Sequence, residues 1–236
     1  MSDIAPKVNV PAIAARITAK TALGMVPGIG PLLVAVVDEI TPVVHAERLQ
    51  GFAEELHHRV LDLASETLAA RMREPDRYKL LEDGLRQAAR ASSRDRISHI
   101  ANIIANGLTA SEARAEDRGY LLKLLDELND VEVLILCAHS RDTMLSAKEF
   151  HERHSEALRR EYPTYGDPPE LLDRDSIRGN YEQHLVRLGL LEEIYHAPYR
   201  KPLALDRYGK PEGIHRELSH LGRYLLREIG LPADVD

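Results

Sequence analysis

The chain has 236 residues and a formal net charge of −7 at pH 7, which suits one large domain or two small ones with a substantial core. The acidic balance argues against broad, non-specific binding to nucleic acid, because positive charge must neutralise the phosphates. A single cysteine, Cys137, excludes an intramolecular disulfide and a zinc site made of several cysteines. Aromatic residues are only 5% of the chain, so we expect a core of leucine, isoleucine, valine and alanine, as in packed helices.

An uncharged segment, Thr21–Val37, lies near the N-terminus and is interrupted by two prolines with two glycines between them. It is slightly short for a membrane-spanning helix, which needs about 20 apolar residues. We expect a turn at Val26–Pro31 and then a helix to about Ile40, folded as a hairpin onto the helical core. An oligomer contact or a membrane-associating hairpin is the alternative, and membrane contact is not favoured. The residues expected at such an interface are Leu23, Val26, Ile29, Leu32 and Leu33.

Long amphipathic helices follow this hairpin. Apolar residues at helical spacing predict one long helix at His45–Arg73, which the following proline ends, because proline disfavours helix in the residue before it. Asp76 is the expected cap of a helix that runs to about Ala91. Ser93 is the expected cap of the next helix, Arg94–Leu108.

Two apolar helices meet at a polar hinge within Tyr120–Cys137. Asn129 or Asp130 can cap the second of them by accepting hydrogen bonds from its free backbone N–H groups. A buried strand is the alternative for Val131–Cys137, because valine and isoleucine favour sheets. We place the domain boundary at this hinge, with a helical domain at residues 1–128 and a second domain at residues 129–236.

The second domain is expected to combine helices with a two-stranded ribbon between Leu190 and Arg216. Its helices are predicted at Asp130–Ala138, Ala147–Glu161, Ser176–Leu188 and Leu218–Ile229. This is the order of elements in a winged helix. The predicted fold class is therefore mainly α, with a helical N-terminal domain followed by a C-terminal winged-helix-like module that carries a short β-ribbon.

Local signals set the ends of these helices. Ser146 and Glu149 have the spacing of a capping box, and Gly189 and Gly230 are expected to end helices. Within the third helix of the module, residues at helical spacing are predicted to face inward. These residues are Ile177, Tyr181, Leu185 and Leu188.

Three stretches of the chain resemble a known family. They are RDRISHIANIIANGL at residues 94–108, YLLKLLDELNDVEVLIL from Tyr120, and the closing ELSHLGRYLLREIG at residues 217–230. The resemblance is to a bacterial and phage-linked family around the abortive-infection alpha protein, and it covers Arg94–Ile229. The chain departs from the family by having Ser219 and His220 in the usual Thr-Pro position. The resemblance implies a role in phage exclusion or host defence and supplies no catalytic residues.

No catalytic, metal or cofactor site is expected from the residue patterns. The run from His151 to His154 is one residue short of the H-E-x-x-H spacing of zinc proteases. Glu54, His57 and His58 lie on a highly charged helix face, where a solvated surface is the ordinary explanation. We therefore expect a protein that is not an enzyme and needs no cofactor.

The ribbon and the helix before it are the candidate contact surface of the module. Acidic residues outnumber basic ones from residue 129 onward, 20 to 15, which is unlike a dedicated DNA-binding domain. The ribbon region nevertheless carries a basic cluster that could touch a nucleic-acid backbone or a partner protein. The candidate contact residues are Arg178, Asn180, Gln183 and Arg187 on the helix and Arg200, Lys201, Arg207 and Lys210 in the ribbon. Glu182 shares that helix face.

These observations favour a defence-associated or phage-related interaction protein that acts by binding a protein partner or by self-association. A winged-helix DNA-binding regulator is the first alternative, and a membrane-associating effector acting through the apolar hairpin is the second. The N-terminus lacks a basic start followed by an apolar core, so a cytoplasmic location is expected.

Overall fold

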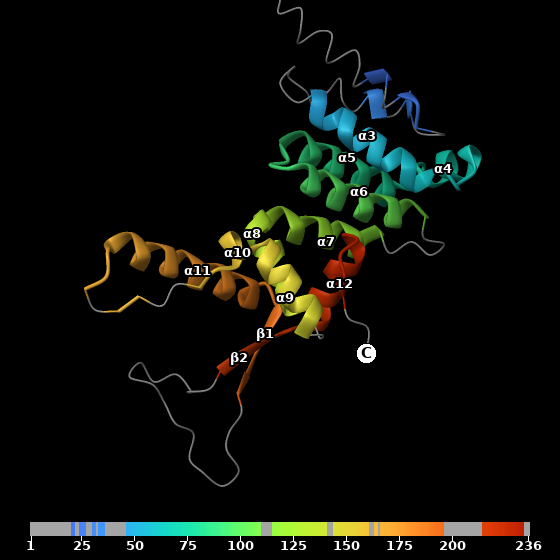
Figure 1. Cartoon of the computed structure of the whole chain (residues 1–236). Helices are drawn as coiled ribbons and strands as arrows, with labels where there is room; N and C mark the ends of the chain where they lie inside the picture. The colour runs from blue at the N-terminus through green and yellow to red at the C-terminus, as the bar shows by residue number, and fades with distance from the viewer. Residues whose placement is uncertain are drawn as a thin grey trace, which may run out of the picture. The chain divides into compact units, whose positions relative to one another are not determined.

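The computed structural model describes residues 20–21, 24–26, 30–31, 33–35, 46–109, 115–140, 144–160, 163–164, 166–195 and 214–233 (Figure 1). The chain divides into two compact units, Met1–Glu127 and Leu128–Asp236. The boundary predicted after residue 128 lies one residue from this division. The described residues are mainly helical, with a two-stranded antiparallel sheet near the C-terminus, which confirms the mainly α fold class.

The first unit is a bundle built around α5 and α6. Its elements are α3 (Ala46–Val60), α4 (Ser65–Arg71), α5 (Pro75–Arg90), α6 (Arg94–Thr109) and α7 (Ala115–Glu127). The helix α3 packs along α6, and α5 contacts α3, α6 and α7. The core that the structure describes is aliphatic apart from Phe52 and Met72, as the composition predicted. Its largest fully buried side chains include Leu49, Phe52, Leu56, Leu68, Leu80, Leu81, Leu85, Ile100 and Ile103.

The prediction of one long helix at His45–Arg73 is wrong. The helix α3 ends at Val60, and the Leu63 N–H donates to the Val60 carbonyl at 3.0 Å as the chain turns into α4. The length of the neighbouring helix explains the break. The 16 residues of α6 span about 24 Å, so a continuous helix of that predicted length would run far past the bundle. The chain turns instead, and α4 returns to contact α6.

The start of α5 also differs from the prediction. Pro75 occupies the first turn of this helix and Glu74 precedes it in extended conformation, so Asp76 lies inside the helix and does not cap it. Proline suits this position because its missing N–H has no partner within the helix there. Ser93 does cap α6 as predicted, since its Oγ accepts from the Arg96 N–H at 3.1 Å.

Two glycines allow α5 and α6 to approach closely. A Cβ at Gly84 would lie 2.6 Å from the Ile104 Cδ1, and a Cβ at Gly107 would collide with Leu80. By contrast, a Cβ at Gly119 in α7 would meet no atom within 4 Å. The crossing of α5 and α6 therefore depends on the absence of a side chain at residues 84 and 107.

Gly84→Ala is expected to lower the free energy of unfolding by about 1–3 kcal/mol, because an extra methyl group must displace a packed isoleucine. Gly119→Ala is the matched control, and alanine should raise stability there by up to about 1 kcal/mol through its higher helix propensity. Urea unfolding followed by circular dichroism compares the two variants. Equal effects at both positions would contradict this account of the crossing.

The apolar hairpin is described only in part. Val26 and Leu33 are buried within the single chain, without a second subunit. The Gly30 N–H donates to the Val26 carbonyl at 2.9 Å. A Cβ at Gly30 would lie 2.7 Å from the carbonyl carbon of Gly24, so the two backbones touch. The other interface candidates, Leu23, Ile29 and Leu32, lie outside the described residues. Among the helices that the structure describes, none has the length and apolar character needed to cross a membrane.

The second unit combines five helices of the described chain with the two strands. Its elements are α8 (Asp130–His139), α9 (Met144–Arg153), α10 (Ser155–Leu158), α11 (Pro169–Arg187), β1 (Leu191–Tyr195), β2 (Ile214–Leu218) and α12 (His220–Glu228). The strands pair antiparallel with Leu191 opposite Leu218 and Tyr195 opposite Ile214. A ribbon between the last two helices is therefore confirmed. Residues 196–213, which connect its strands, lie outside the described part of the chain.

The helix α8 begins with a capping box. The Glu132 N–H donates to the Asn129 Oδ1 at 2.9 Å, and the Asn129 N–H donates to the Glu132 carboxylate at 2.8 Å. This confirms the helical interpretation of Val131–Cys137, and the strand alternative is wrong. Cys137 is buried, as expected for an apolar helix.

Four predictions about helix boundaries in this unit are wrong. Ser146 lies inside α9, so it does not cap that helix, and a break at His154 separates α9 from α10. The helix α11 begins at Pro169, earlier than the predicted Ser176, because proline fits the first turn of a helix. The closing helix α12 begins at His220, where the Ser219 Oγ accepts from the Gly222 N–H at 2.9 Å.

Candidate functional site

A groove in the second unit is the strongest candidate site among the described residues. It has a volume of about 780 Å³ and lies between α10 and α11, with Val131 of α8 at its edge. We call it the α10–α11 groove. The residues that line it are Val131, Ser155, Glu156, Ala157, Arg159, Arg174, Ile177, Arg178 and Tyr181.

The wall formed by α11 is one face of that helix. Ile177 and Arg178 each lie three or four residues from Arg174 and from Tyr181, so the four side chains share one broad face of the helix. Ile177 is 53% exposed, so the prediction that it faces the core is wrong. Leu185 is fully buried, as predicted. The apolar stripe of α11 therefore begins in the groove and enters the core only in the C-terminal half of the helix.

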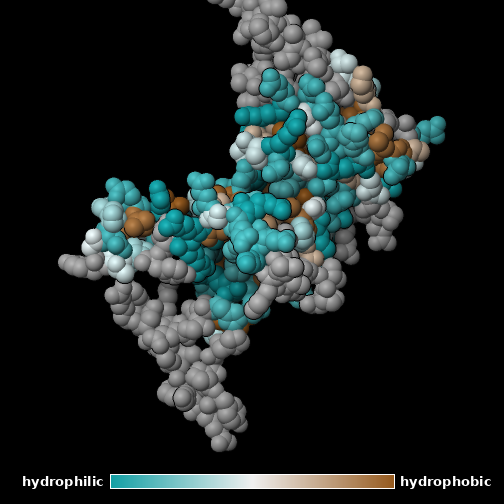
Figure 2. All heavy atoms as spheres, viewed as in Figure 1, coloured by the Kyte–Doolittle hydropathy of each residue, from teal (hydrophilic) through white to brown (hydrophobic). Residues whose placement is uncertain are grey.

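The surface of the second unit reflects this arrangement. Figure 2 shows hydrophobic side chains over α11 within a surface that is otherwise largely hydrophilic. Two large apolar residues of this helix, Leu172 and Ile177, are about half exposed. Exposed apolar side chains that gather in a groove mark an interaction site more often than isolated ones do.

A buried ionic cluster lies at the base of α11. The Glu182 carboxylate is buried, and it accepts from the Arg160 Nη2 at 2.5 Å and from Arg216, with the Arg178 Nε at 3.5 Å. Arg216 also pairs with Glu193, at 3.0 Å. Burial lowers the pKa of the Arg178 guanidinium. These charges hold α11 to the segment after α10 and to the ribbon.

The structure changes the expected role of several candidate contact residues on α11. Arg178 lies in the ionic cluster and also donates to the Ala157 carbonyl at 3.0 Å, and the Gln183 side-chain amide donates to Glu193 at 3.3 Å. Asn180 and Arg187 are exposed, as a contact role requires. The ribbon candidates lie outside the described residues. They are Arg200, Lys201, Arg207 and Lys210.

Sequence reasoning missed two carboxylates of this unit. Glu132 pairs with the His184 Nδ1 at 2.7 Å in addition to its role in the capping box, and Glu182 was expected on the outer face of α11. The signal for Glu132 was available, because Asn129 and Glu132 have capping-box spacing. For Glu182, the sequence could predict only the ion pair with Arg178, which lies one helical turn away. The partners Arg160 and Arg216 are too distant in sequence to have been found.

His139 lies beside this cluster and its pKa is lowered. Burial of the imidazole is the largest cause, the charges of Arg160 and Arg178 add to it, and the Glu182 carboxylate opposes it. The unfolded chain, with a histidine pKa of about 6.5, then binds more protons than the folded chain below that pH. The contribution of His139 to the free energy of unfolding is therefore fully present above about pH 6.5 and falls as the pH drops toward the lowered pKa.

We expect the free energy of unfolding to fall less between pH 7.5 and pH 5.5 in His139→Gln than in the unsubstituted chain, because the variant lacks this proton linkage. Urea unfolding of both proteins at the two pH values measures the difference. An NMR titration of the His139 imidazole checks the cause directly. A titration midpoint at or above about 6.5 would contradict the lowered pKa.

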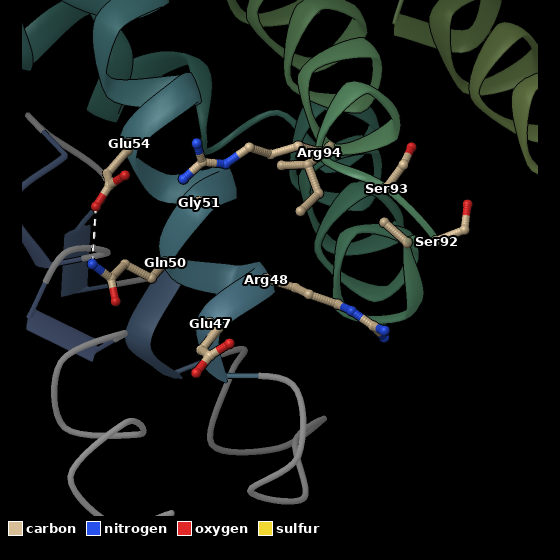
Figure 3. Close-up of a pocket in the computed structure, with 10 residues that line it drawn as sticks. Glu47, Arg48, Gln50, Gly51, Glu54, Ser92, Ser93 and Arg94 are labelled. Atoms are coloured by element: carbon tan, nitrogen blue, oxygen red, sulfur yellow. Dashed lines mark hydrogen bonds between the residues drawn. The ribbon is translucent and has the colours of Figure 1, made fainter. Parts of the chain in front are cut away.

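A smaller pocket, of about 390 Å³, lies in the first unit between α3 and the turn from α5 to α6 (Figure 3). The Gln50 amide donates to the Glu54 carboxylate at 3.0 Å, as Figure 3 shows. Arg48, also on its wall, donates to the Ala89 carbonyl at 3.3 Å. Two carboxylates and two guanidiniums line this pocket, so their charges balance and favour neither an anion nor a cation.

Arginines in both units bind the C-terminal ends of neighbouring helices. The last four carbonyls of a helix have no partner within it and carry the negative end of the helix dipole, so a guanidinium is a suitable donor. In each pair a guanidinium N–H donates to a backbone carbonyl. The pairs are Arg48 with Ala89 (3.3 Å), Arg77 with Leu108 (3.2 Å), Arg96 with Leu125 (2.6 Å) and Arg178 with Ala157 (3.0 Å). These arginines serve the fold, which reduces the positive charge available for phosphates.

In the described part of the chain, no group of three or more His, Cys, Asp or Glu residues is arranged to hold a metal ion. No protein-family model matches the chain, and neither the curated proteins nor the solved structures give a match.

Proposed function

We propose that the chain is a non-enzymatic interaction protein and that its second unit binds another protein through the α10–α11 groove. The observation that carries this proposal is the exposure of Ile177 within a groove that also presents Val131, Ala157 and Tyr181. An exposed isoleucine is unfavourable in water, and a partner that covers it gains the free energy of apolar burial. A role in phage exclusion or host defence remains the prediction implied by the family resemblance.

We further propose that this unit is a winged-helix-like module. The order α8, α9 with α10, α11, β1, β2 and α12 supports the proposal, because a winged helix places a two-stranded ribbon directly after its third helix. Gly189, with a φ of 71°, ends α11 and lets the chain turn at once into β1. In this arrangement α11 is the helix that would meet a ligand.

DNA binding is the second candidate function. The order of α11 and the ribbon favours it, because a winged helix that binds DNA has the same order of elements. The charges oppose it, because Arg178 is held by Glu182 and acidic residues outnumber basic ones from residue 129 onward.

We expect labelled duplex DNA to show no salt-dependent binding at physiological ionic strength. Binding that weakens between about 50 and 200 mM salt, and weakens further in Arg207→Ala with Lys210→Ala, would favour the DNA-binding candidate instead.

Affinity capture tests the protein-binding proposal. The full chain is incubated with nuclease-treated extract of the organism that encodes it, in parallel with Ile177→Asp and Leu61→Asp. Leu61 is a similarly exposed apolar residue in the first unit, outside the groove, so its variant is the matched control. We expect a defined protein to be retained by the unsubstituted chain and by the control and lost with Ile177→Asp. Equal retention by all three would contradict a role for the groove.

A further inference from the structure

The lining of the α10–α11 groove combines apolar and charged side chains. Val131, Ala157, Ile177 and Tyr181 supply the apolar part, and the volume of about 780 Å³ lies within the range of sites that enclose a ligand group. An occupant must therefore present at least one large apolar side chain. Burial of Ile177 by the occupant would contribute the largest favourable free energy among the apolar lining residues, because half of its surface is exposed to water.

The charged lining is predominantly positive. Among the described residues, Arg159, Arg174 and Arg178 line the groove against one carboxylate, Glu156, and Arg178 also pairs with Glu182. Asp173 and Asp175 flank Arg174 in sequence, but adjacent residues of a helix diverge and neither aspartate lines the groove. The described lining thus carries local positive charge on a chain whose formal net charge is −7.

The ionic cluster beneath the groove does not cancel this charge. It contains three guanidiniums, those of Arg160, Arg178 and Arg216, and two carboxylates, those of Glu182 and Glu193. A groove lined by apolar side chains and by an excess of guanidiniums attracts negatively charged partners and disfavours positive ones.

We propose that the α10–α11 groove binds an acidic segment of a partner protein, one that places a large apolar side chain between carboxylates. The inference rests on the proposed function and adds the chemistry of the partner. The apolar side chain covers Ile177, and the carboxylates face Arg174 and Arg159. A nucleic acid fits less well, because single-stranded binding relies on aromatic platforms and Tyr181 is the one aromatic side chain among the described residues that line this groove.

Three synthetic peptides provide the test. Each has about 12 residues, roughly 18 Å as a helix, with a central Phe or Leu flanked by Glu, Lys or Gln, and each carries a fluorescent label. Anisotropy titrations with the full chain measure their affinities. We expect the Glu peptide to bind about tenfold more tightly than the Gln peptide, and the Lys peptide to bind most weakly. The advantage of the Glu peptide should shrink as salt screens the charges.

Charge reversal supplies the matched variants. Arg174→Glu leaves two guanidiniums and two carboxylates in the described lining, so it should remove the advantage of the Glu peptide over the Gln and Lys peptides. Arg187→Glu makes the same change at an exposed position of α11 outside the groove and should preserve the original order. Ile177→Asp should abolish binding of all three peptides. Circular dichroism and the urea midpoint confirm that each variant keeps its fold.

Several outcomes would overturn the inference. One is that the Glu peptide binds no more tightly than the Gln peptide, and another is that Arg174→Glu and Arg187→Glu have identical effects. A third is that single-stranded DNA displaces the Glu peptide. A fourth is that the chain dimerises and that Ile177→Asp abolishes the dimer. The last outcome would assign the groove to a second copy. Because the capture assay is independent of partner charge, retention that depends on Ile177 would support the interaction function even if the acidic partner is wrong.

Discussion

Glu182→Gln is expected to lower the free energy of unfolding of the second unit by about 3–5 kcal/mol, because it removes the one carboxylate that Arg160, Arg178 and Arg216 share. Glutamine keeps the size of the side chain, so packing changes little. Three guanidiniums then lie close together with less compensating charge, and Arg178 is largely buried. Removing one partner of a buried ionic cluster leaves an uncompensated charge in a medium that solvates it poorly.

Asp173→Asn is the matched control for this change. It removes one negative charge from the same helix, but Asp173 is exposed, so an effect within about 0.5 kcal/mol is expected. Native-state hydrogen exchange of the α11 and α12 amides reports the stability of the second unit by itself. Equal effects of the two substitutions would show that the cluster contributes nothing to holding α11 in place.

Gly222→Ala is expected to lower the free energy of unfolding by about 3 kcal/mol, at the upper end of the cost of an added methyl group in a packed core. A Cβ at Gly222 would press against the carbonyl oxygen of Leu190 and lie 2.7 Å from the Leu218 Cδ1. The Leu190 carbonyl cannot retreat freely, because it accepts from the Ser219 N–H at 3.1 Å. The added methyl group therefore separates α12 from the start of the ribbon.

Gly179→Ala provides the opposite expectation within the same unit. Gly179 lies in α11, and a Cβ there would meet no atom within 4 Å. Alanine should raise stability by up to about 1 kcal/mol, because it loses less backbone freedom on folding than glycine does. Thermal unfolding followed by circular dichroism compares the two variants. A Gly222→Ala variant as stable as the unsubstituted chain would contradict the close packing of α12 on Leu190.

Local rules of helix capping explain much of what the sequence predicted correctly. Ser93 and Asn129 cap α6 and α8, and Gly189 and Gly230 end helices with positive φ values of 71° and 79°. Each of these features depends on a few consecutive residues. The order of helices and ribbon in the second unit followed from the same signals together with hydrophobic periodicity.

Features that depend on distant contacts were not predictable in this way. The break after α3 reflects the length of α6, and the burial of Glu182 depends on partners 22 and 34 residues away. The groove is a further example, because periodicity placed Ile177 on the apolar stripe but did not reveal that this part of the stripe is left uncovered. The sequence pattern of such a stripe predicts a core residue, whereas the structure shows that Ile177 is exposed.

Site-specific photo-crosslinking tests the central claim most directly, namely that the α10–α11 groove binds protein. A photoreactive phenylalanine analogue replaces Tyr181 in the groove or, as a control, the exposed Tyr120 of the first unit. Irradiation in the producing cells is followed by nuclease treatment and electrophoresis. The account predicts a discrete adduct from the groove position that survives nuclease and disappears when Ile177→Asp is added. An adduct removed by nuclease, or equal crosslinking from both positions, would contradict it.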